Sequence, residues 1–431
     1  MLTRSVDAAL QARDNGMGLI DYLRSRGYVQ DISDETALTE TFASRTVTAY
    51  VGFDPTAASL HVGHLLSIMV LGTLQRFGHR PIALAGGGTT MVGDPTGKTA
   101  TRKVLTLDEI RENLRAVIGQ FDRYIDFAGG RFGEDSPAAL LVNNADWLLE
   151  LKYIDFLRDI GRHFSFNEML AAETYKVRLE STGLNFVEFN YRIVQAYDFL
   201  HLFRSVGCQL QMGGSDQWGN IVAGVDLIRR VEGKQAFALV TPLITTASGQ
   251  KMGKSEGNSL WLDPHMTSPY DYFQYWINTD DADVRSLLYL YTFLPGDQIE
   301  LLTAESGEAL REAKRVLAYE STALTHGRAA ADEAMAASSR LFGASATLDA
   351  ADSSLPTVEI PRAGAEALTI ADIFVLAGLA TSRGDARRTA AQGGLTLDDA
   401  RVTDVDSLLG NTDPHILRAG KKRFTRVAFI D

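Results

Sequence analysis

The stretch VTAYVGFDPTAASLHVGH, residues 47–64, contains the features that decide the fold. Apolar residues occupy every odd position from 47 to 53, and this period of two predicts a β-strand. The Asp-Pro-Thr sequence at 54–56 predicts a turn, and the apolar run at 63–77 predicts a helix. A strand that turns directly into a helix is typical of parallel sheets, which bind ligands at the carboxyl ends of their strands.

The same alternation of strands and helices continues through the first 260 residues or so. One helix is predicted from residue 107, opened by a capping box between Thr106 and Glu109, and another at 186–204. Further strands are predicted at residues 81–85, 139–143, 208–212 and 238–245. Strands interleaved with helices predict an α/β fold with a Rossmann-like parallel sheet.

The composition of the chain changes after Pro264. Residues 268–292 and 307–342 are helix-rich, whereas 343–364 have the small, acidic and proline-containing composition of a linker. We therefore predict a Rossmann-like domain at 1–262, a helical domain at 263–342, a linker at 343–364 and a small α+β module at 365–431.

Composition also excludes several classes of protein. No apolar run approaches the ~20 residues of a membrane span, so no membrane partner is expected. The single cysteine, Cys208, cannot build a disulfide framework, which predicts a cytoplasmic protein. The net charge of -12 argues against a uniformly basic surface, so any RNA contact must be local. The acidic excess lies before residue 363, because residues 363–431 carry 9 basic and 9 acidic side chains.

His61-Val62-Gly63-His64 lies where the predicted strand turns into the predicted helix. The first N–H groups of a helix and the helix dipole attract anions such as phosphate. Histidines at i and i+3 can both face such an anion, and Gly63 lets a ligand approach the backbone closely. Alone, the string fits a chance match or a pair of core histidines equally well.

A second basic motif, Lys251-Met252-Gly253-Lys254-Ser255, lies in a loop rich in Gly, Ser and Thr. Two lysines on such a loop can close over a triphosphate and offset charge that develops in a transition state. An isolated lysine pair is more often part of a solvated loop. Here the two anion-binding motifs occur in one chain, in this order and about 190 residues apart.

This pair of motifs resembles the His-Ile-Gly-His and Lys-Met-Ser-Lys-Ser signatures of class I aminoacyl-tRNA synthetases. The chain departs from them at Val62 and Gly253, and neither change removes a charged or imidazole group. Four more segments resemble bacterial-type tyrosyl-tRNA synthetases: YVGFDPT (50–56), GDPTGK (93–98), YRIVQAYD (191–198) and GGSDQWGN (213–220). The segment at 93–98 is not a P-loop, because three residues separate its glycines where that motif needs four.

The resemblance implies a tyrosine–tRNA ligase reaction in two steps. ATP activates L-tyrosine to tyrosyl-adenylate with release of pyrophosphate, and the tyrosyl group then passes to the 3′-terminal adenosine of tRNA(Tyr). The implied cofactor is Mg²⁺ carried by ATP, with no prosthetic group and no dedicated protein metal site. The resemblance also implies a homodimer, and it makes residues 263–342 the anticodon-side domain.

A tyrosine site is implied around the helix predicted at 186–204. There Tyr191, Gln195 and Asp198 are spaced i, i+4 and i+7 and lie on one stripe, which by spacing alone fits a pocket or a solvent-facing surface. The resemblance implies that Tyr191 and Gln195 bind the substrate ammonium, and that Asp198 and Tyr50 bind its phenol hydroxyl. The remaining residues implied for this site are Asp94, Gln211 and Gln217.

The ATP site implied by the resemblance includes both signature motifs. Five residues would act in catalysis, namely His61, His64, Lys251, Lys254 and Thr56. The histidines and lysines would oppose phosphate charge, and Thr56 would approach the phosphates. The residues implied to bind ATP are Asp54, His61, Gly63, His64, Gly214, Asp216, Lys251, Lys254 and Ser255, with Asp216 on the ribose.

Two regions are candidates for tRNA binding. By resemblance, Lys98 and Arg102 lie in a mobile loop that contacts pyrophosphate or the acceptor end. In the tail, compact basic patches suit an RNA backbone, and their pattern resembles a ribosomal-protein-type RNA-binding module with an αL motif. The tail alone also fits a charged surface without a ligand. Its basic residues are Arg383, Arg387, Arg388, Lys421, Lys422 and Arg423.

Two other readings of the motifs remain open. A tryptophanyl-type class I synthetase shares the fold class, but the polar tyrosine-like pocket and the C-terminal module count against it. A non-catalytic RNA-binding paralogue of a synthetase would be expected to have lost His64 or Lys254, and the chain retains both.

Overall fold

The computed structural model describes residues 7–96, 106–134, 136–171, 173–180, 183–245, 252, 254–255, 258–305, 307–342, 357–362, 365–409, 414–420 and 423–430. The chain folds into two compact units. Unit 1 comprises Met1–Thr267 and Thr279–Leu317, and unit 2 comprises Ser268–Asn278 and Ala318–Asp431. Within the described ranges, no helix is both long and apolar enough to cross a lipid bilayer.

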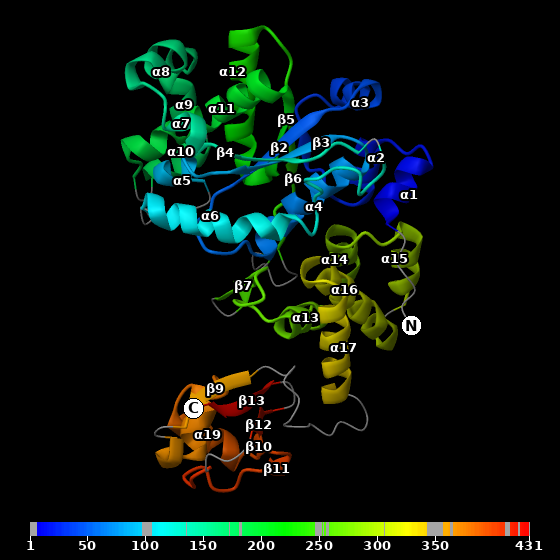
Figure 1. Cartoon of the computed structure of the whole chain (residues 1–431), viewed down its shortest axis with the longest axis vertical. Helices are drawn as coiled ribbons and strands as arrows, with labels where there is room; N and C mark the ends of the chain where they lie inside the picture. The colour runs from blue at the N-terminus through cyan, green and yellow to red at the C-terminus, as the bar shows by residue number, and fades with distance from the viewer. Residues whose placement is uncertain are drawn as a thin grey trace. The chain divides into compact units, whose positions relative to one another are not determined.

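Unit 1 is built around a six-stranded sheet in the order β1-β6-β5-β2-β3-β4 (Figure 1). Neighbouring strands are parallel except β1 and β6. The chain winds from β2 to one edge and returns through β5 on the other side of β2, and ligand crevices open at such a reversal. The strands are β1 (Asp31–Ile32), β2 (Thr48–Phe53), β3 (Arg80–Ala85), β4 (Leu140–Asn143), β5 (Cys208–Gly214) and β6 (Phe237–Thr241).

Helices cover both faces of this sheet, with α11 and α12 on one face and α4 and α6 on the other (Figure 1). A hairpin of β7 (Lys254–Ser255) and β8 (Asn258–Ser259) forms a separate two-stranded sheet. The helices of unit 1 are α1 (Ala8–Asp14), α2 (Leu19–Ser25), α3 (Glu35–Ser44), α4 (Val62–Arg76), α5 (Thr89–Val92), α6 (Leu107–Phe121), α7 (Ala145–Leu148), α8 (Tyr153–Asp159), α9 (Phe166–Ala171), α10 (Glu173–Glu180), α11 (Phe186–Val206), α12 (Trp218–Glu232), α14 (Val284–Tyr291), α15 (Gly296–Leu302) and the first part of α16 (Glu308–His326).

The predicted α/β class is confirmed. The strand predicted at 47–53 and the helix predicted at 63–77 are also confirmed, as β2 and α4. The predicted capping box is also present: Thr106 Oγ1 accepts the N–H of Glu109 at 3.2 Å, and Glu109 Oε2 accepts that of Thr106 at 2.7 Å. The last predicted strand is shorter than expected, since β6 ends at Thr241. Residues 242–245 therefore leave the sheet ahead of the second signature motif.

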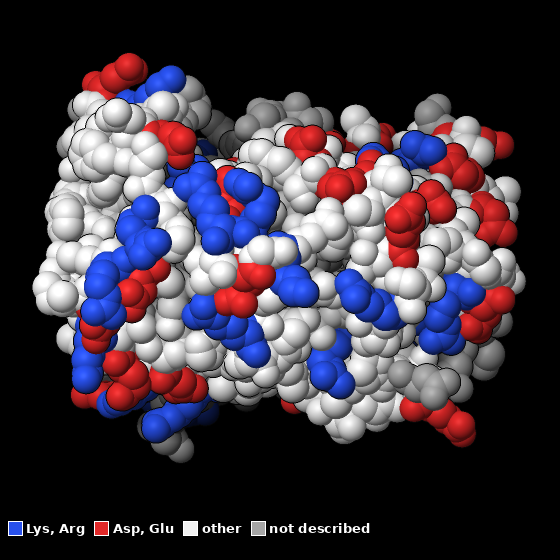
Figure 2. Space-filling model, turned by 90° about the horizontal axis from the view of Figure 1, so that it is seen from above, with Lys and Arg blue, Asp and Glu red and all other residues white. Residues whose placement is uncertain are grey.

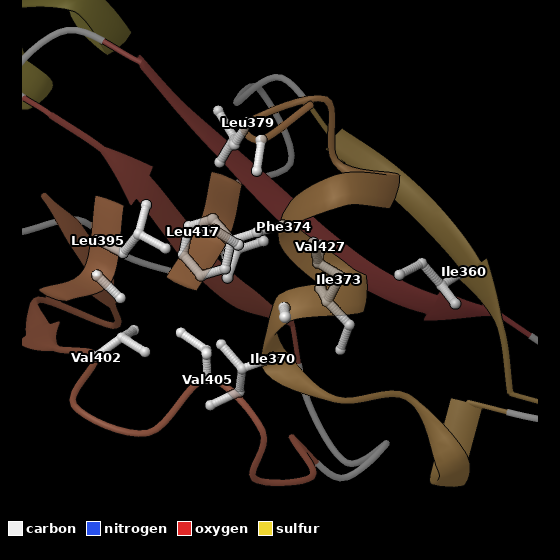
Figure 3. Packing of buried hydrophobic residues seen from close by; sticks show 14 of the residues in the cluster. Ile360, Ile370, Ile373, Phe374, Leu379, Leu395, Val402, Val405, Leu417 and Val427 are labelled. Atoms are coloured by element: carbon white, nitrogen blue, oxygen red, sulfur yellow. The ribbon is translucent and has the colours of Figure 1, made fainter. Parts of the chain in front are cut away.

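Unit 2 contains a five-stranded sheet in the order β11-β10-β12-β13-β9. Apolar residues of its strands pack against one face of α18 (Figure 3), which gives this small module a core of its own. The elements are α13 (Pro269–Ile277), the end of α16, α17 (Arg328–Phe342), β9 (Thr357–Pro361), α18 (Ile370–Leu376), α19 (Arg383–Ala391), β10 (Leu395–Leu397), β11 (Ala400–Arg401), β12 (His415–Ala419) and β13 (Arg423–Ile430).

The segment predicted as a linker, 343–364, contains one strand of this sheet. β9 pairs in parallel with β13, and Ile360 belongs to the buried core. Val358 and Ile360 alternate with polar or exposed neighbours, a short strand pattern that the small and acidic composition obscured. The C-terminal sheet therefore begins before residue 365.

Candidate active site

The residues predicted to bind tyrosine meet where the winding of the sheet reverses. Tyr50 on β2 is paired in register with Gln211 on β5. Asp198 and Tyr191 lie on α11, which packs against β5. All four side chains are buried, and Asp198 is only 2% exposed. Polar groups this deeply buried need hydrogen-bond partners, and those partners define the site.

Asp198 has two donors that sequence analysis did not identify. Asn144 Nδ2 donates to Asp198 Oδ2 at 2.8 Å, and Trp147 Nε1 donates to Asp198 Oδ1 at 2.7 Å. Burial raises the pKa of Asp198 to about 8, although these two hydrogen bonds act in the opposite direction. The protein alone thus fixes the position of the carboxyl group and places its titration close to neutral pH.

A chain of hydrogen bonds connects Asp198 to Asp54, a residue predicted for the ATP site. Asn144 Nδ2 also donates to Thr89 Oγ1 at 3.0 Å, and the Thr89 hydroxyl donates to Asp54 Oδ1 at 3.1 Å. Asn144 is itself held by the backbone N–H of Gly88, which donates to its Oδ1 at 2.7 Å. The predicted tyrosine and ATP sites therefore share one polar framework.

Three consecutive glycines after β3 make this close approach possible. A Cβ atom on Gly86 would lie 2.3 Å from Asp54 Oδ1, and one on Gly87 would lie 2.3 Å from Asn143 Oδ1. A Cβ on Gly88 would lie 2.8 Å from the side chain of Leu148. At these distances a larger residue would have to displace the side chains of Asp54, Asn143 or Leu148, so the glycines leave these side chains room for their observed positions.

Three of the predicted tyrosine-site residues have buried polar atoms without a hydrogen-bond partner in the described part of the chain. These atoms are Tyr50 Oη, Gln195 Oε1 and Gln211 Oε1. Burial and the neighbouring Asp198 raise the pKa of Tyr50, so its hydroxyl keeps its proton. Buried polar atoms without a hydrogen-bond partner are rare in native folds. Three of them in one predicted site indicate that a polar ligand supplies the missing hydrogen bonds.

Asp94, predicted to bind the substrate ammonium, is also held by the protein. The N–H of Thr96 donates to Asp94 Oδ1 at 2.9 Å, and Gln217 Nε2 donates to Asp94 Oδ2 at 2.7 Å. Asn220 in turn donates to Gln217 Oε1 at 3.1 Å. The structure therefore brings together the motifs at 93–98 and 213–220, which lie in different parts of the sequence.

The histidines of the first motif are fixed by the first turn of α4. His61 Nδ1 accepts the N–H of Gly63 at 3.0 Å, and His64 Nδ1 accepts the N–H of His61 at 3.2 Å. The two rings stack with their centroids 4.0 Å apart. A ring nitrogen that accepts a hydrogen bond carries no proton, so each neutral imidazole has its proton on Nε2. Both rings can therefore donate from Nε2 to an anion.

The second signature motif lies against the first. The N–H of Val62 donates to Leu260 O at 3.0 Å, so the chain after the second motif runs antiparallel to the start of α4. A Cβ on Gly63 would lie 3.7 Å from Met252 O, within the second motif, and 2.7 Å from His61 Cε1. Gly63 thus makes room for the His61 ring, as well as for any ligand.

The other predicted ATP-site residues lie after β2, at the end of β5 and in the hairpin of β7 and β8. Thr56 is exposed after β2, and its N–H donates to Asp54 O at 2.8 Å. Gly214 ends β5, Asp216 lies in the following 3-10 turn (Ser215–Gln217), and β7 is formed by Lys254 and Ser255. The predicted residues that lie outside the described part of the chain are Lys98, Arg102, Lys251, Lys421 and Lys422.

A cavity of about 260 Å³ is lined by Arg192 and Trp218, among others, and by none of the predicted tyrosine-site residues. The Arg192 guanidinium lies 5.7 Å from the centre of the Tyr175 ring, and burial lowers its pKa. Its Nε is buried without a hydrogen-bond partner among the described residues. Two acidic side chains, Glu168 and Asp226, line the same cavity.

In the C-terminal module, every arginine predicted on α19 has an acidic partner. These exposed ion pairs leave less net positive charge on the helix than the sequence suggests. Arg423, at the start of β13, donates to the carbonyl of Gly378 at 2.6 Å. The three pairs are Arg383–Asp372, Arg387–Asp406 and Arg388–Asp385.

Two other arginines of this module have no acidic partner among the described residues. Thr396 on β10 pairs with Arg401 on β11 and with Arg418 on β12, so the three side chains form a row on one face of the sheet. The adjacent Leu395 and Leu417 point to the other face and into the core (Figure 3). In this row Arg401 is exposed and Arg418 is half-buried, and helix periodicity could not reveal their proximity.

Comparison with known proteins agrees with this geometry. A family model described as tRNA synthetases class I (W and Y) matches residues 43–343. A second, described as the tyrosine–tRNA ligase SYY-like C-terminal domain, matches residues 348–427. A protein of Desulfatibacillum aliphaticivorans named tyrosine–tRNA ligase is 49% identical, over 96% of this chain and 99% of that protein. The chain belongs to the class I tyrosyl-tRNA synthetases.

Other members of this family support the assignment over most of the length. A tyrosine–tRNA ligase of Clostridium botulinum (strain Hall) is 48% identical over 94% of this chain and 98% of its own. Among solved structures, a C-terminally truncated mitochondrial tyrosyl-tRNA synthetase of Aspergillus nidulans aligns with a TM-score of 0.68 and 31% identity, over 77% of this chain and 97% of that one.

The raised pKa of Asp198 predicts that selection of tyrosine over phenylalanine depends on pH. A hydroxyl that donates to this group stabilises its ionised form, so tyrosine affinity should rise as pH increases towards about 8 and level off above it. Between pH 7 and 8.5 we expect the ratio of phenylalanine to tyrosine dissociation constants to grow by roughly tenfold.

Phenylalanine is the internal control in this titration, because its ammonium group titrates like that of tyrosine. Isothermal titration calorimetry would give both constants. A ratio that stays flat from pH 6.5 to 8.5 would show that Asp198 is already ionised throughout this range.

Proposed function

We propose that this chain is a tyrosine–tRNA ligase whose specificity comes from the buried polar pocket between β2, β5 and α11. The observation that carries the proposal is the pre-positioned carboxyl of Asp198 beside Tyr50, two polar groups that an apolar amino acid would leave unsatisfied. A site that hydrogen-bonds a hydroxyl rejects the analogue that lacks it, and tyrosyl-tRNA synthetases are the known example of this effect.

Each end of the substrate has a matching set of groups in the pocket. Asp198 and Tyr50 take the phenol hydroxyl, and Asp94 takes the ammonium group, assisted by Gln195 and Tyr191. Asp94 accepts only one hydrogen bond per oxygen from the described residues, so its carboxylate retains lone pairs for a charged donor. The pocket therefore selects an amino acid with a polar group at the far end of its side chain.

Adenylate formation requires positioning and charge stabilisation, and no covalent enzyme intermediate. A tyrosine carboxylate oxygen forms a bond to the α-phosphorus of ATP, and the bond from that phosphorus to the pyrophosphate oxygen breaks. We place the Nε2–H groups of His61 and His64 towards the phosphate oxygens, where negative charge builds in the transition state. Lys251 and Lys254 would oppose the same charge from the other motif. Mg²⁺ carried by ATP would offset charge on the triphosphate.

The terminal adenosine of tRNA(Tyr) then takes the tyrosyl group. A ribose hydroxyl oxygen bonds to the carbonyl carbon of the adenylate, and AMP leaves with the electron pair of the broken bond. Asp54, Gly214 and Asp216 would hold the adenosine, and Thr56 would lie near the phosphates. We further propose that this chemistry takes place in the cytoplasm, which suits a chain whose single cysteine is buried and unpaired.

The two alternatives that the sequence left open both conflict with particular observations. A tryptophanyl-type enzyme would place an indole against Asp198 and the unpartnered Tyr50 Oη, and an indole offers one N–H donor and no acceptor. A non-catalytic RNA-binding protein would not need the paired histidine tautomers at the start of α4. The family model that matches residues 348–427 is also specific to tyrosine–tRNA ligases.

An exchange assay tests the proposed function directly. The purified chain should catalyse exchange of pyrophosphate into ATP far more efficiently with tyrosine than with any of the other nineteen amino acids, including tryptophan and phenylalanine. Changing Tyr50 to Phe removes one neutral hydrogen bond, so the ratio of kcat/KM for tyrosine over phenylalanine should fall by roughly 2- to 10-fold. Exchange that depends on tryptophan, or on no amino acid, would refute the proposal.

We propose that the tRNA contacts the C-terminal module mainly through the row of Arg401 and Arg418. An arginine that is already paired with an acidic residue must lose that partner to bind phosphate. Arg401 and Arg418 have no acidic partner to lose among the described residues. The chain has a net charge of -12, and Figure 2 shows basic and acidic side chains interspersed over one face of the molecule. Local patches must therefore provide the attraction for RNA.

Charge removal should distinguish the two kinds of arginine. Arg401→Ala and Arg418→Ala should each raise the KM for tRNA more than Arg387→Ala does, and each should reduce the slope of log affinity against log salt by about one. Pyrophosphate exchange should stay unchanged in all three variants. An Arg387→Ala effect as large as the other two would instead favour the α19 surface.

We also propose that the chain forms a homodimer through the segment at 149–187. Large apolar side chains are exposed along this segment, including Ile154 (70%), Phe166 (63%) and Phe186 (68%). Exposed apolar groups concentrated in one segment mark interaction sites, and a second copy of the chain is the partner that the family resemblance implies. The dimer would cover side chains that water otherwise contacts.

A charge placed in this surface should separate the two copies. Phe186→Asp should shift the protein from dimer to monomer in sedimentation equilibrium at micromolar concentration. Leu301→Asp is the control, because Leu301 is 80% exposed on α15, outside this segment, and should leave the dimer intact. If the parent chain sediments as a monomer, the dimer proposal is wrong.

A further inference from the structure

His201 forms a ring stack one step removed from the predicted tyrosine site. It lies on α11, three residues after Asp198, and its ring is parallel to that of Trp147 from α7. The two ring centroids are 4.4 Å apart with 12° between the planes. Trp147 is the residue whose Nε1–H donates to Asp198 Oδ1 at 2.7 Å. The imidazole therefore covers one face of the indole that holds the selective carboxyl.

The orientation of the indole decides whether this hydrogen bond forms. The Nε1–H bond lies in the ring plane, so rotation of the ring about its side-chain torsions moves the proton away from Asp198. α7 is a four-residue helix and Trp147 is only half-buried, so the indole depends on contacts outside its own helix. A parallel ring on one face restricts that rotation, and aromatic pairs of this kind contribute beyond their buried area.

We propose that His201 is a positioning residue for tyrosine selection, acting through Trp147 on the carboxyl of Asp198. This inference rests on the proposed function, because it assumes that Asp198 reads the substrate hydroxyl. His201 itself does not contact the substrate. Its effect should therefore fall on the recognition of tyrosine, and not on ATP.

The stack is formed by two flat rings, 4.4 Å apart with 12° between their planes. Burial, and to a smaller extent the neighbouring Arg204, lower the pKa of His201, so the imidazole is neutral at pH 7. Its other ring neighbour is Tyr197, with centroids 6.4 Å apart and the planes tilted. A neutral aromatic ring of similar size should therefore replace the imidazole, whereas an aliphatic side chain of similar volume should not.

The test compares three substitutions at this position in the full-length chain. His201→Phe keeps a flat ring, His201→Leu keeps apolar volume without a ring, and His201→Ala removes both. The measurement is pyrophosphate exchange with tyrosine and with phenylalanine, with KM and kcat determined separately for tyrosine and ATP. Thermal melts of each variant control for folding.

We expect His201→Ala and His201→Leu to lower the tyrosine-to-phenylalanine ratio of kcat/KM by roughly 2- to 10-fold, mainly through KM for tyrosine. KM for ATP should not change, and His201→Phe should restore the ratio to within about twofold of the parent. Equal ratios in the Leu variant and the parent, or equal losses in the Leu and Phe variants, would overturn the inference. A parent chain that does not activate tyrosine would instead overturn the proposed function itself.

Discussion

A carboxyl group buried away from water must be held by donors, and the burial of Asp198 is the constraint from which the rest of the site follows. Its donors, Asn144 and Trp147, come from the segment after β4. That segment can reach α11 only because glycines after β3 leave space for it. Asn144 also donates to Thr89, which donates to Asp54, so hydrogen bonds connect the two predicted substrate sites. The framework is complete in the protein alone, which is the preorganisation that catalysis by positioning requires.

Hydrogen bonds of the protein alone also position the two signature motifs. The backbone N–H groups at the start of α4 lack helical partners, and two of them donate to the Nδ1 atoms of His61 and His64. These hydrogen bonds satisfy two N–H groups at the start of the helix, and they also determine the tautomer of both imidazole rings. Antiparallel pairing of His61 with Trp261 then brings the chain that follows the second motif to this point. Two motifs about 190 residues apart in the sequence therefore lie close together in the fold.

The sequence predicted most of the fold and the residue types of the site, because both depend on local patterns. The capping box at Thr106, the strand at β2 and the stripe on α11 need only a few neighbouring residues to be recognised. The donors of Asp198 could not be predicted in this way, since Asn144 reaches α11 through strand order and not through spacing. β9 was hidden by the composition around it, and its partner β13 lies about seventy residues later. Neither the contact of Asn144 with α11 nor the pairing of β9 with β13 produces a periodic pattern in the sequence.

The arginines of the C-terminal module show why charge counts alone mislead. The sequence places Arg383, Arg387 and Arg388 on one helical face, and the structure confirms their helix but gives each an aspartate. Exposed pairs of this kind contribute little to stability, so RNA phosphate can compete for the arginines, but each exchange leaves a carboxylate beside the new anion. Arg401 and Arg418 lose no such partner among the described residues. We therefore propose the strand face as the RNA contact, although residues 363–431 carry equal numbers of basic and acidic side chains, 9 of each.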